Sequence, residues 1–444
     1  MDKAPEYPPP RYAGYVVVVL TVAYVFSFID RQIVALLVQP IKQDLGLSDT
    51  QMSLLMGLAF GIFYTLMGIP LGRAADRFSR RAIIAGGIAL WSLMTAACGL
   101  AKNYGQLFAA RVGVGVGEAS LTPSALSLIS DYFPKEKRGR AIGFYNMGIS
   151  IGAGVAMILG GLVISYAASA PEVVLPLVGE IRPWQLVFII VGLPGLLISA
   201  LMITVREPKR HGLIKSGQAG KSLPLGFIAR YLLQRWRAFG GLFLGMSVVT
   251  IVGYAYFSWV PTMFIRNFGW SIQQVGLVYG ILLLICGPLG VNLAGWLADT
   301  LYRKGQRDGH LKTVLAATIL TLPTASLMPL MPTPELTVAM LIPASIGPAM
   351  ATATGASSLM MITPNQMRGQ ASAIYMFVIS ILGLTVGPTA VALITDYVYA
   401  DESALRYSIA WVSFAGAAIS TVVLALSLKP YQQAIEESEG WSET

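Results

Sequence analysis

Long apolar runs follow one another along the chain, with short polar connections between them. Each run has about 20 residues or more, which is enough for a helix to cross a bilayer. The pattern predicts an all-α membrane protein with twelve spans. The expected spans are 13–38, 51–72, 81–101, 105–131, 139–168, 184–205, 239–265, 272–298, 311–331, 335–361, 370–396 and 404–428.

Composition points the same way. Of 444 residues, 55% are hydrophobic and 12% are charged, and the mean hydropathy is +0.66. Soluble domains carry about 25% charged residues, so both a soluble enzyme and a disordered chain are excluded. Two cysteines argue against a disulfide scaffold, and two histidines argue against a histidine-based metal site. Neither a metal nor a cofactor is expected.

The positions of the basic residues explain the net charge of +9. On the predicted span map, 24 of the 31 Lys and Arg residues lie at the termini and in alternate connections, and five lie on the opposite side. This bias predicts that both termini are cytoplasmic. The charge is therefore a topology signal, and no nucleic-acid partner is expected. A multi-pass protein of the cell membrane follows, and the absence of an N-x-[ST] sequon favours a bacterial inner membrane.

The longest polar connection, residues 206–238, divides the chain into an N-terminal six-span bundle (1–205) and a C-terminal six-span bundle with a short tail (239–444). Apolar residues recur at helical spacing within this connection, beside three arginines. They are Leu225, Ile228, Leu232 and Trp236, beside Arg230, Arg235 and Arg237. The pattern suits either an interfacial helix on an anionic leaflet or a solvated linker.

The two halves repeat each other's polar landmarks. Gly72 and Asp76 follow the second span, and Gly295 and Asp299 follow the eighth at an offset of 223. The segment 133–141 follows the fourth span, and 363–371 follows the tenth at an offset of 230. Nearly equal offsets predict two parallel six-helix repeats, a design that places substrate near the bilayer midplane.

These segments resemble the major facilitator superfamily. Residues 72–81 are similar to its loop signature G-x-x-x-D-R-x-G-R-R, with Ser79 at the second glycine, and residues 111–117 are similar to its R-x-x-x-G-x-G element. Within the superfamily the chain resembles the Spinster group in residues 28–31, 117–120 and 131–140. The resemblance implies the major facilitator fold, alternating access and, for the subgroup, export of lysophospholipids and sphingosine-1-phosphate.

Four ionisable residues stand out because they lie well inside predicted spans, away from the span ends: Asp30, Arg31, Arg111 and Glu118. Charges inside a membrane are costly and usually functional. Helical rise places Asp30 and Arg111 at matching depth, with Glu118 roughly 10 Å closer to the cytoplasm. We expect Asp30 to carry protons, because a moving arginine changes which protonation state is favoured. Arg111 is the expected partner of Asp30 or Glu118.

The same four residues are the proposed proton-coupling group, and Arg31, Arg111 and Glu118 are also candidate substrate ligands, because the fork of an arginine suits an anionic phosphate head group. The competing interpretation is a buried charge cluster that only fixes helix packing. By family analogy, Tyr254 and Trp259 in the seventh span and Thr354 in the tenth line the other side of the cavity. An aromatic and hydroxyl lining suits an amphipathic substrate.

Gating is predicted for the loop motifs. The resemblance implies that Asp76 caps a helix of the other half and pairs with an arginine, which latches the outward-facing state, while Gly72 permits close packing of spans. The other gating candidates are Arg77, Arg81, Arg138 and Asp299. The competing interpretation is that these charges only set topology.

The sequence contains no phosphate-binding loop, no H-E-x-x-H and no nucleophile–base set. An enzyme, including a membrane-embedded hydrolase, and an ATP-driven pump are therefore not expected. The favoured function is a proton-coupled secondary transporter of lysophospholipid or sphingolipid-like molecules. It works as a monomer by alternating access, with the substrate, protons and membrane lipids as its partners. The alternatives are an exporter of small organic anions or drugs and a non-transporting receptor.

Overall fold

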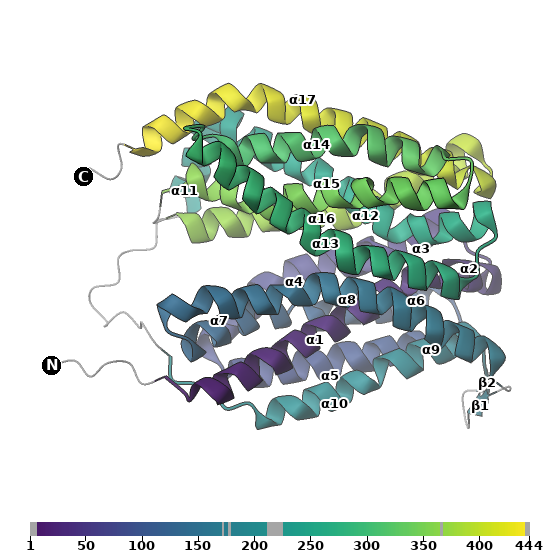
Figure 1. Cartoon of the computed structure of the whole chain (residues 1–444). Helices are drawn as coiled ribbons and strands as arrows, with labels where there is room; N and C mark the ends of the chain where they lie inside the picture. The colour runs from purple at the N-terminus through teal and green to yellow at the C-terminus, as the bar shows by residue number, and fades with distance from the viewer. Residues whose placement is uncertain (1–6, 171–172, 176–178, 211–224, 365–366, 440–444) are drawn as a thin grey trace. The chain divides into compact units, whose positions relative to one another are not determined.

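The computed structural model describes residues 7–170, 173–175, 179–210, 225–364 and 367–439. Almost all of these residues are helical (Figure 1). Twelve helical segments among them are long and apolar enough to cross a membrane. The predicted number of spans and the all-α fold class are therefore confirmed.

The first six spans contain several paired helices. They comprise α1 (Pro10–Leu36), α3 (Asp49–Met56) with α4 (Leu58–Arg77), α5 (Arg80–Cys98), α6 (Tyr104–Glu118) with α7 (Leu121–Tyr132), α8 (Lys135–Ser169), and α9 (Pro183–Gly192) with α10 (Pro194–Leu201). A short helix α2 (Val38–Leu45) follows α1, and a 3₁₀ turn covers Met202–Thr204. The break before α10 coincides with Pro194, which has no N–H to donate.

The second six spans are mostly continuous. They comprise α12 (Trp236–Phe268), α13 (Ile272–Arg303), α14 (Gly309–Leu327), α15 (Pro334–Met361), α16 (Arg368–Leu393) and α17 (Leu405–Glu439), preceded by α11 (Leu225–Gln234). Short 3₁₀ turns cover Met328–Leu330 and Glu402–Ala404, and a π-helical turn covers Ile394–Tyr399.

Local capping explains where several helices begin. Ser48 accepts a hydrogen bond from the Gln51 N–H at 3.1 Å, and the Gln51 side chain accepts one from the Ser48 N–H, which completes a capping box for α3. Asn103 caps α6 and Thr333 caps α15 through their side-chain oxygens. Two short strands for which the sequence predicted no element, β1 (Val173–Leu175) and β2 (Gly179–Ile181), pair in antiparallel fashion.

Several helix pairings recur in both halves of the chain. In the first half α1 packs against α8, α5 against α6, and α5 against α9 and α10. In the second half α12 packs against α16, α14 against α15, and α14 against α17. Spans one and five correspond to spans seven and eleven, and spans three, four and six correspond to nine, ten and twelve. The predicted two-fold repeat is therefore present in the packing.

The chain divides into two compact units. Unit 1 is Met1–Ile214 with Gly269–Leu284, and unit 2 is Lys215–Phe268 with Ile285–Thr444. The boundary between residues 214 and 215 lies inside the predicted connection 206–238. Of that connection the structure describes 206–210, which belong to unit 1, and 225–238, which belong to unit 2; Lys215 and Lys221 lie outside the described residues.

Candidate functional site

The four intramembrane charges meet inside unit 1. Asp30 and Arg31 lie on α1, and Arg111 and Glu118 lie on α6. Asp30, Arg111 and Glu118 are each only 1% exposed. The residues that the sequence singled out therefore form one buried cluster, which we call the charge cluster.

Glu118 pairs with Arg31. The Arg31 Nη2 lies 2.8 Å from the Glu118 Oε2, and the Ser27 hydroxyl donates to the same oxygen at 2.7 Å. Ser27 and Arg31 are one helical turn apart on α1, so both reach the same carboxylate. Of the two partners expected for Arg111, Asp30 or Glu118, Glu118 is therefore paired with Arg31 in this structure.

Three aromatic rings surround the Arg31 guanidinium. Its Cζ lies 4.9 Å from the Phe28 ring centroid, 4.5 Å from that of Phe60 and 4.9 Å from that of Tyr64. Each distance lies within the range of a cation–π interaction. The rings and the Glu118 carboxylate together fix the position of this charge.

Arg111 contacts Asp30 through the backbone. The Arg111 Nη1 donates to the Asp30 carbonyl oxygen at 3.2 Å, and its Cζ lies 5.5 Å from the Phe60 ring centroid. Among the described residues, neither carboxyl oxygen of Asp30 and neither Nε nor Nη2 of Arg111 has a hydrogen-bond partner. The cluster therefore holds a buried acid and a buried cation side by side with unused hydrogen-bonding capacity.

Helix α5 also contributes residues to the charge cluster, and they were not predicted from the sequence. Trp91 and Thr95, both buried, lie one helical turn apart and near the Asp30 carboxyl. Cys98, also buried, lies within electrostatic range of Asp30 and Arg111. The available signal was the polar spacing of Trp91, Ser92 and Thr95 within an otherwise apolar span.

The predicted substrate residues of unit 2 make packing contacts. Trp259 is buried, and its Nε1 donates to the Pro388 carbonyl at 2.8 Å. The Thr354 hydroxyl donates to the Met350 carbonyl of its own helix at 2.9 Å. Tyr254 is half-buried and lies close to Gly383 of α16. Their contact with a substrate stays a prediction.

The predicted gating residues lie at the polar ends of the helices. Asp76 and Arg77 are exposed at the end of α4, and the Asp76 backbone carbonyl accepts a hydrogen bond from Arg210. Asp299 is exposed on α13, and its carbonyl accepts from the Arg303 Nε at 3.3 Å. A Cβ added at Gly72 would lie 3.7 Å from the Pro123 Cβ, an ordinary contact, so this structure leaves room for alanine there.

The other two gating candidates bind backbone carbonyls of unit 1. The Arg81 Nη1 donates to the Val205 carbonyl at 3.2 Å, and the Arg138 Nη2 donates to the Ser130 carbonyl at 2.8 Å. Both contacts give a hydrogen-bond donor to carbonyls at helix ends, where no intrahelical N–H is available. The latch itself involves both units and stays a prediction.

A second ionic group near the loop motif was missed by the sequence interpretation. Arg80 is buried, forms an ion pair with Asp131, and donates through Nε to the Glu207 Oε1 at 2.7 Å. The Glu207 Oε2 also accepts from the Arg81 N–H and the Ser79 hydroxyl, each at 3.0 Å. Burial alone would raise the pKa of Glu207, but these hydrogen bonds and the Arg80 charge hold it below its usual value. The available signal was an acidic residue within the basic connection 206–238.

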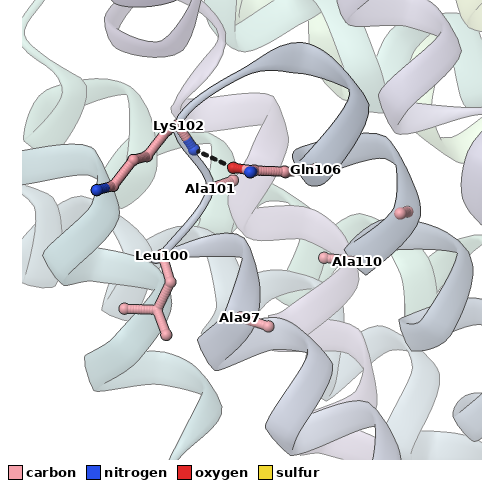
Figure 2. Close-up of a pocket in the computed structure, with 7 residues that line it drawn as sticks. Ala97, Leu100, Ala101, Lys102, Gln106 and Ala110 are labelled. Atoms are coloured by element: carbon pink, nitrogen blue, oxygen red, sulfur yellow. Dashed lines mark hydrogen bonds between the residues drawn. The ribbon is translucent and has the colours of Figure 1, made fainter. Parts of the chain in front are cut away.

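An open surface pocket of about 510 Å³ lies where α5 turns into α6 (Figure 2). Its lining is mainly small and apolar, with Lys102 and Gln106 as the polar members; the others are Ala97, Leu100, Ala101, Ala109 and Ala110. The Lys102 N–H donates to the Gln106 Oε1 at 2.7 Å. The pocket contains none of the predicted site residues. Within the described part of the chain, no three His, Cys, Asp or Glu side chains converge on a possible metal site.

Known proteins match this chain over most of its length. The chain is 29% identical over 398 residues to an MFS-type efflux pump of Mycolicibacterium smegmatis, covering 89% of this chain and 87% of the relative. It is 27% identical over 292 residues to a probable L-galactonate transporter of Escherichia coli, covering 64% and 61% of the two chains.

A solved structure matches the fold. A bacterial homologue of the human lysosomal transporter Spinster, in an inward-facing and unoccupied conformation, superposes with a TM-score of 0.77 at 26% identity. The match covers 97% of this chain and 98% of that one. Residues 20–307 match the Major Facilitator Superfamily. The chain therefore belongs to the Major Facilitator Superfamily and is a membrane transporter, not an enzyme.

Proposed function

We propose that this transporter is driven by protons and that Asp30 is its proton carrier. The observation that carries the proposal is the Asp30 carboxyl, which is 1% exposed and has no hydrogen-bond partner among the described residues. Glu118 differs, because it already pairs with Arg31 and Ser27. Asp30 is thus the carboxyl that can change its protonation without breaking an ion pair.

Arg111 is the proposed binding group for an anionic substrate. Its Nη1 is held by the Asp30 carbonyl at 3.2 Å, while Nε and Nη2 have no partner among the described residues. Those two nitrogens lie on one edge of the guanidinium, and that edge can bind a carboxylate or phosphate through two parallel hydrogen bonds. A substrate anion there would weaken the attraction of Arg111 for Asp30, which couples binding to the proton.

The proposed substrate is a lysophospholipid or a sphingolipid-like molecule. Support comes from the structural likeness to the Spinster homologue over nearly the whole chain and from the sequence resemblance to the same group. The alternative substrate is a small organic anion. It is favoured by the similarity to the probable L-galactonate transporter and to a hexuronate transporter of Bacillus subtilis.

The proposed cycle is alternating access by two six-helix domains, residues 1–205 and 239–444, of a monomer in a bacterial inner membrane. The Asp76 latch would hold one of its states. Asp76→Asn is expected to shift the balance of states, and labelling of a cysteine introduced on either side of the membrane would report that shift. Unchanged accessibility on both sides would count against the latch.

The test is transport by the full chain in proteoliposomes with an imposed pH gradient. Asp30→Asn is expected to abolish gradient-driven transport while leaving substrate exchange at equal pH. Glu335→Gln, at an exposed carboxylate in the first turn of α15, is the matched control. Gradient-driven transport by Asp30→Asn would refute the proton role.

The substrate is tested with the same vesicles. Labelled lysophosphatidylglycerol and labelled galactonate are offered in parallel, and Arg111→Lys is compared with the parent chain. Lysine keeps the charge but loses the two-pronged geometry, so affinity for the true substrate is expected to fall. Transport of galactonate without transport of lysolipid would refute the lipid assignment and leave the proton role standing.

A further inference from the structure

Helix α11, at the start of unit 2, is attached to its unit by one face only. Ile228 is buried, and Tyr231 and Leu232 pack against the hydrophobic core of the unit. The Arg235 Nη2 lies 2.7 Å from the Glu437 Oε2 of α17, and the Arg235 Cζ lies 4.3 Å from the Tyr231 ring centroid. These contacts fix the rotation of α11 about its axis.

The opposite face of α11 and the first turn of α12 present large apolar side chains between arginines. Phe227 is 51% exposed, Leu233 70% and Trp236 62%. Arg230 and Arg237 are exposed between them, and the Arg237 Cζ lies 5.7 Å from the Trp236 ring centroid. We call these five residues the basic–aromatic face.

This face is not the one that the sequence pattern suggested. In the apolar stripe predicted from the sequence, Ile228 is buried and Leu232 packs against the core of unit 2. These two residues face inward because the core of unit 2 covers that part of the stripe. Trp236, the last residue of that stripe, is exposed. The Leu225 side chain lies outside the described residues. Phe227 and Leu233, the other exposed apolar residues, do not belong to the helical stripe that was identified in the sequence.

Two observations indicate what covers the basic–aromatic face. First, its apolar surface continues along α12, where Trp236, Gly240 and Leu244 are exposed at four-residue spacing on a membrane-spanning helix. Second, its charges are both positive, and Arg230 and Arg237 form no ion pair within the part of the chain that the structure describes. Aromatic and leucine side chains mixed with arginine are the composition of a helix at an anionic membrane surface.

We propose that the basic–aromatic face binds anionic phospholipids of the adjoining leaflet. Phe227, Leu233 and Trp236 would lie at the boundary between head groups and acyl chains. Arg230 and Arg237 would bind phosphate groups, for which the arginine fork is suited. The bound lipid would hold the start of α12 at a fixed depth, whichever substrate the transporter carries.

The test uses Trp236 as a probe in the full chain. The protein is reconstituted into vesicles that contain either brominated phosphatidylglycerol or brominated phosphatidylcholine, since bromine quenches tryptophan fluorescence at contact. Subtracting the signal of Trp236→Phe isolates Trp236 from the other tryptophans. We expect stronger quenching by the anionic lipid, in mixtures where both lipids compete.

Removing the charges provides the decisive comparison. The double variant Arg230→Gln/Arg237→Gln is expected to reduce the selectivity for anionic lipid by about five-fold for each arginine. This factor corresponds to the typical attraction of one basic residue to an anionic membrane surface. Arg230→Lys with Arg237→Lys should keep most of it. The matched control, Arg303→Gln with Lys304→Gln, removes two exposed charges elsewhere in unit 2 and should change nothing.

Three results would overturn the proposal. Insensitivity of Trp236 to both brominated lipids would place the face in water or against a protein. Equal quenching by the two lipids would show apolar contact without recognition of charge. Equal losses in the control and in the arginine pair would show a general effect of net charge.

Discussion

Two glycines of α6 offer a matched pair of substitutions beside the charge cluster. A Cβ added at Gly115 would lie 2.5 Å from the Phe60 backbone carbonyl oxygen, and one added at Gly113 would lie 2.5 Å from the Met94 Cγ. Both glycines are in the same helix, two residues apart. We predict that Gly115→Ala destabilises the protein and that Gly113→Ala does not.

The magnitude follows from what each Cβ meets. An ordinary Cβ contact begins near 3.4 Å, so the contact at Gly115 is short by about 0.9 Å. The backbone of α4 must move to relieve it, and such overpacking costs about 1–3 kcal/mol. At Gly113 the neighbour is a methionine side chain, which can change rotamer at little cost. The helix-propensity gain of about 1 kcal/mol for Gly→Ala is common to both variants, so their difference isolates the clash.

The assay is thermal unfolding of both variants in the same detergent, followed by transport in proteoliposomes. Gly115→Ala should unfold at a lower temperature than Gly113→Ala, by about 2–4 °C for each kcal/mol. Because the Phe60 ring contacts both Arg31 and Arg111, Gly115→Ala should also reduce transport. Equal stability of the two variants, or a more stable Gly115→Ala, would refute the reasoning.

Three further predictions concern the ionic and hydrogen-bonded groups of unit 1. Arg31→Gln leaves the Glu118 carboxylate buried without its ion pair and should cost about 3–5 kcal/mol of unfolding free energy; adding Glu118→Gln should recover part of that loss, and additive losses in this double-mutant cycle would contradict the pairing. The pKa of Glu207 is lower in the folded protein than its usual value of about 4.3. The Glu207 carboxylate therefore stabilises the folded state above about pH 4.3, and this stabilisation is lost as the pH falls through the folded-state pKa. Glu207→Gln should therefore flatten the acid decline of stability, measured by thermal unfolding across the acid range, and an unchanged slope would argue against it. Tyr132→Phe removes a 2.5 Å hydrogen bond to the Arg206 carbonyl and should cost about 1 kcal/mol, whereas Tyr166→Phe, at an exposed residue, should cost nothing measurable; equal costs would show that the bond is not the cause.

The span pattern and the repeat could be predicted because they depend on long-range averages of the sequence. A run of about 20 apolar residues has one stable structure in a bilayer, a helix that satisfies its own backbone. The same averaging made Asp30, Arg31, Arg111 and Glu118 conspicuous, since each is a charge inside such a run. Helical rise also matched the depth of Asp30 with that of Arg111, but it did not predict that Glu118 would pair with Arg31.

The choice of partners could not be predicted in the same way. Whether Arg31 or Arg111 reaches Glu118 depends on the rotation of α1 about its axis, which helical spacing alone leaves open. Ser27, one turn from Arg31, reaches the same carboxylate and reveals that rotation in the structure. Trp91 and Thr95 were missed because the sequence does not say which face of α5 the charge cluster meets.

The burial of both cysteines has a practical consequence for following the transport cycle. Cys98 and Cys286 are at most 2% exposed, so the natural chain offers water-soluble thiol reagents almost no target in this conformation. Cys98 lies beside Asp30 and Arg111, and its thiolate, the reactive form, needs water to exist. In a Cys286→Ser background, the rate at which a charged maleimide modifies Cys98 would therefore report how often the charge cluster opens to a water-soluble reagent. The protein thus carries its own accessibility reporter beside Asp30, the proposed proton carrier.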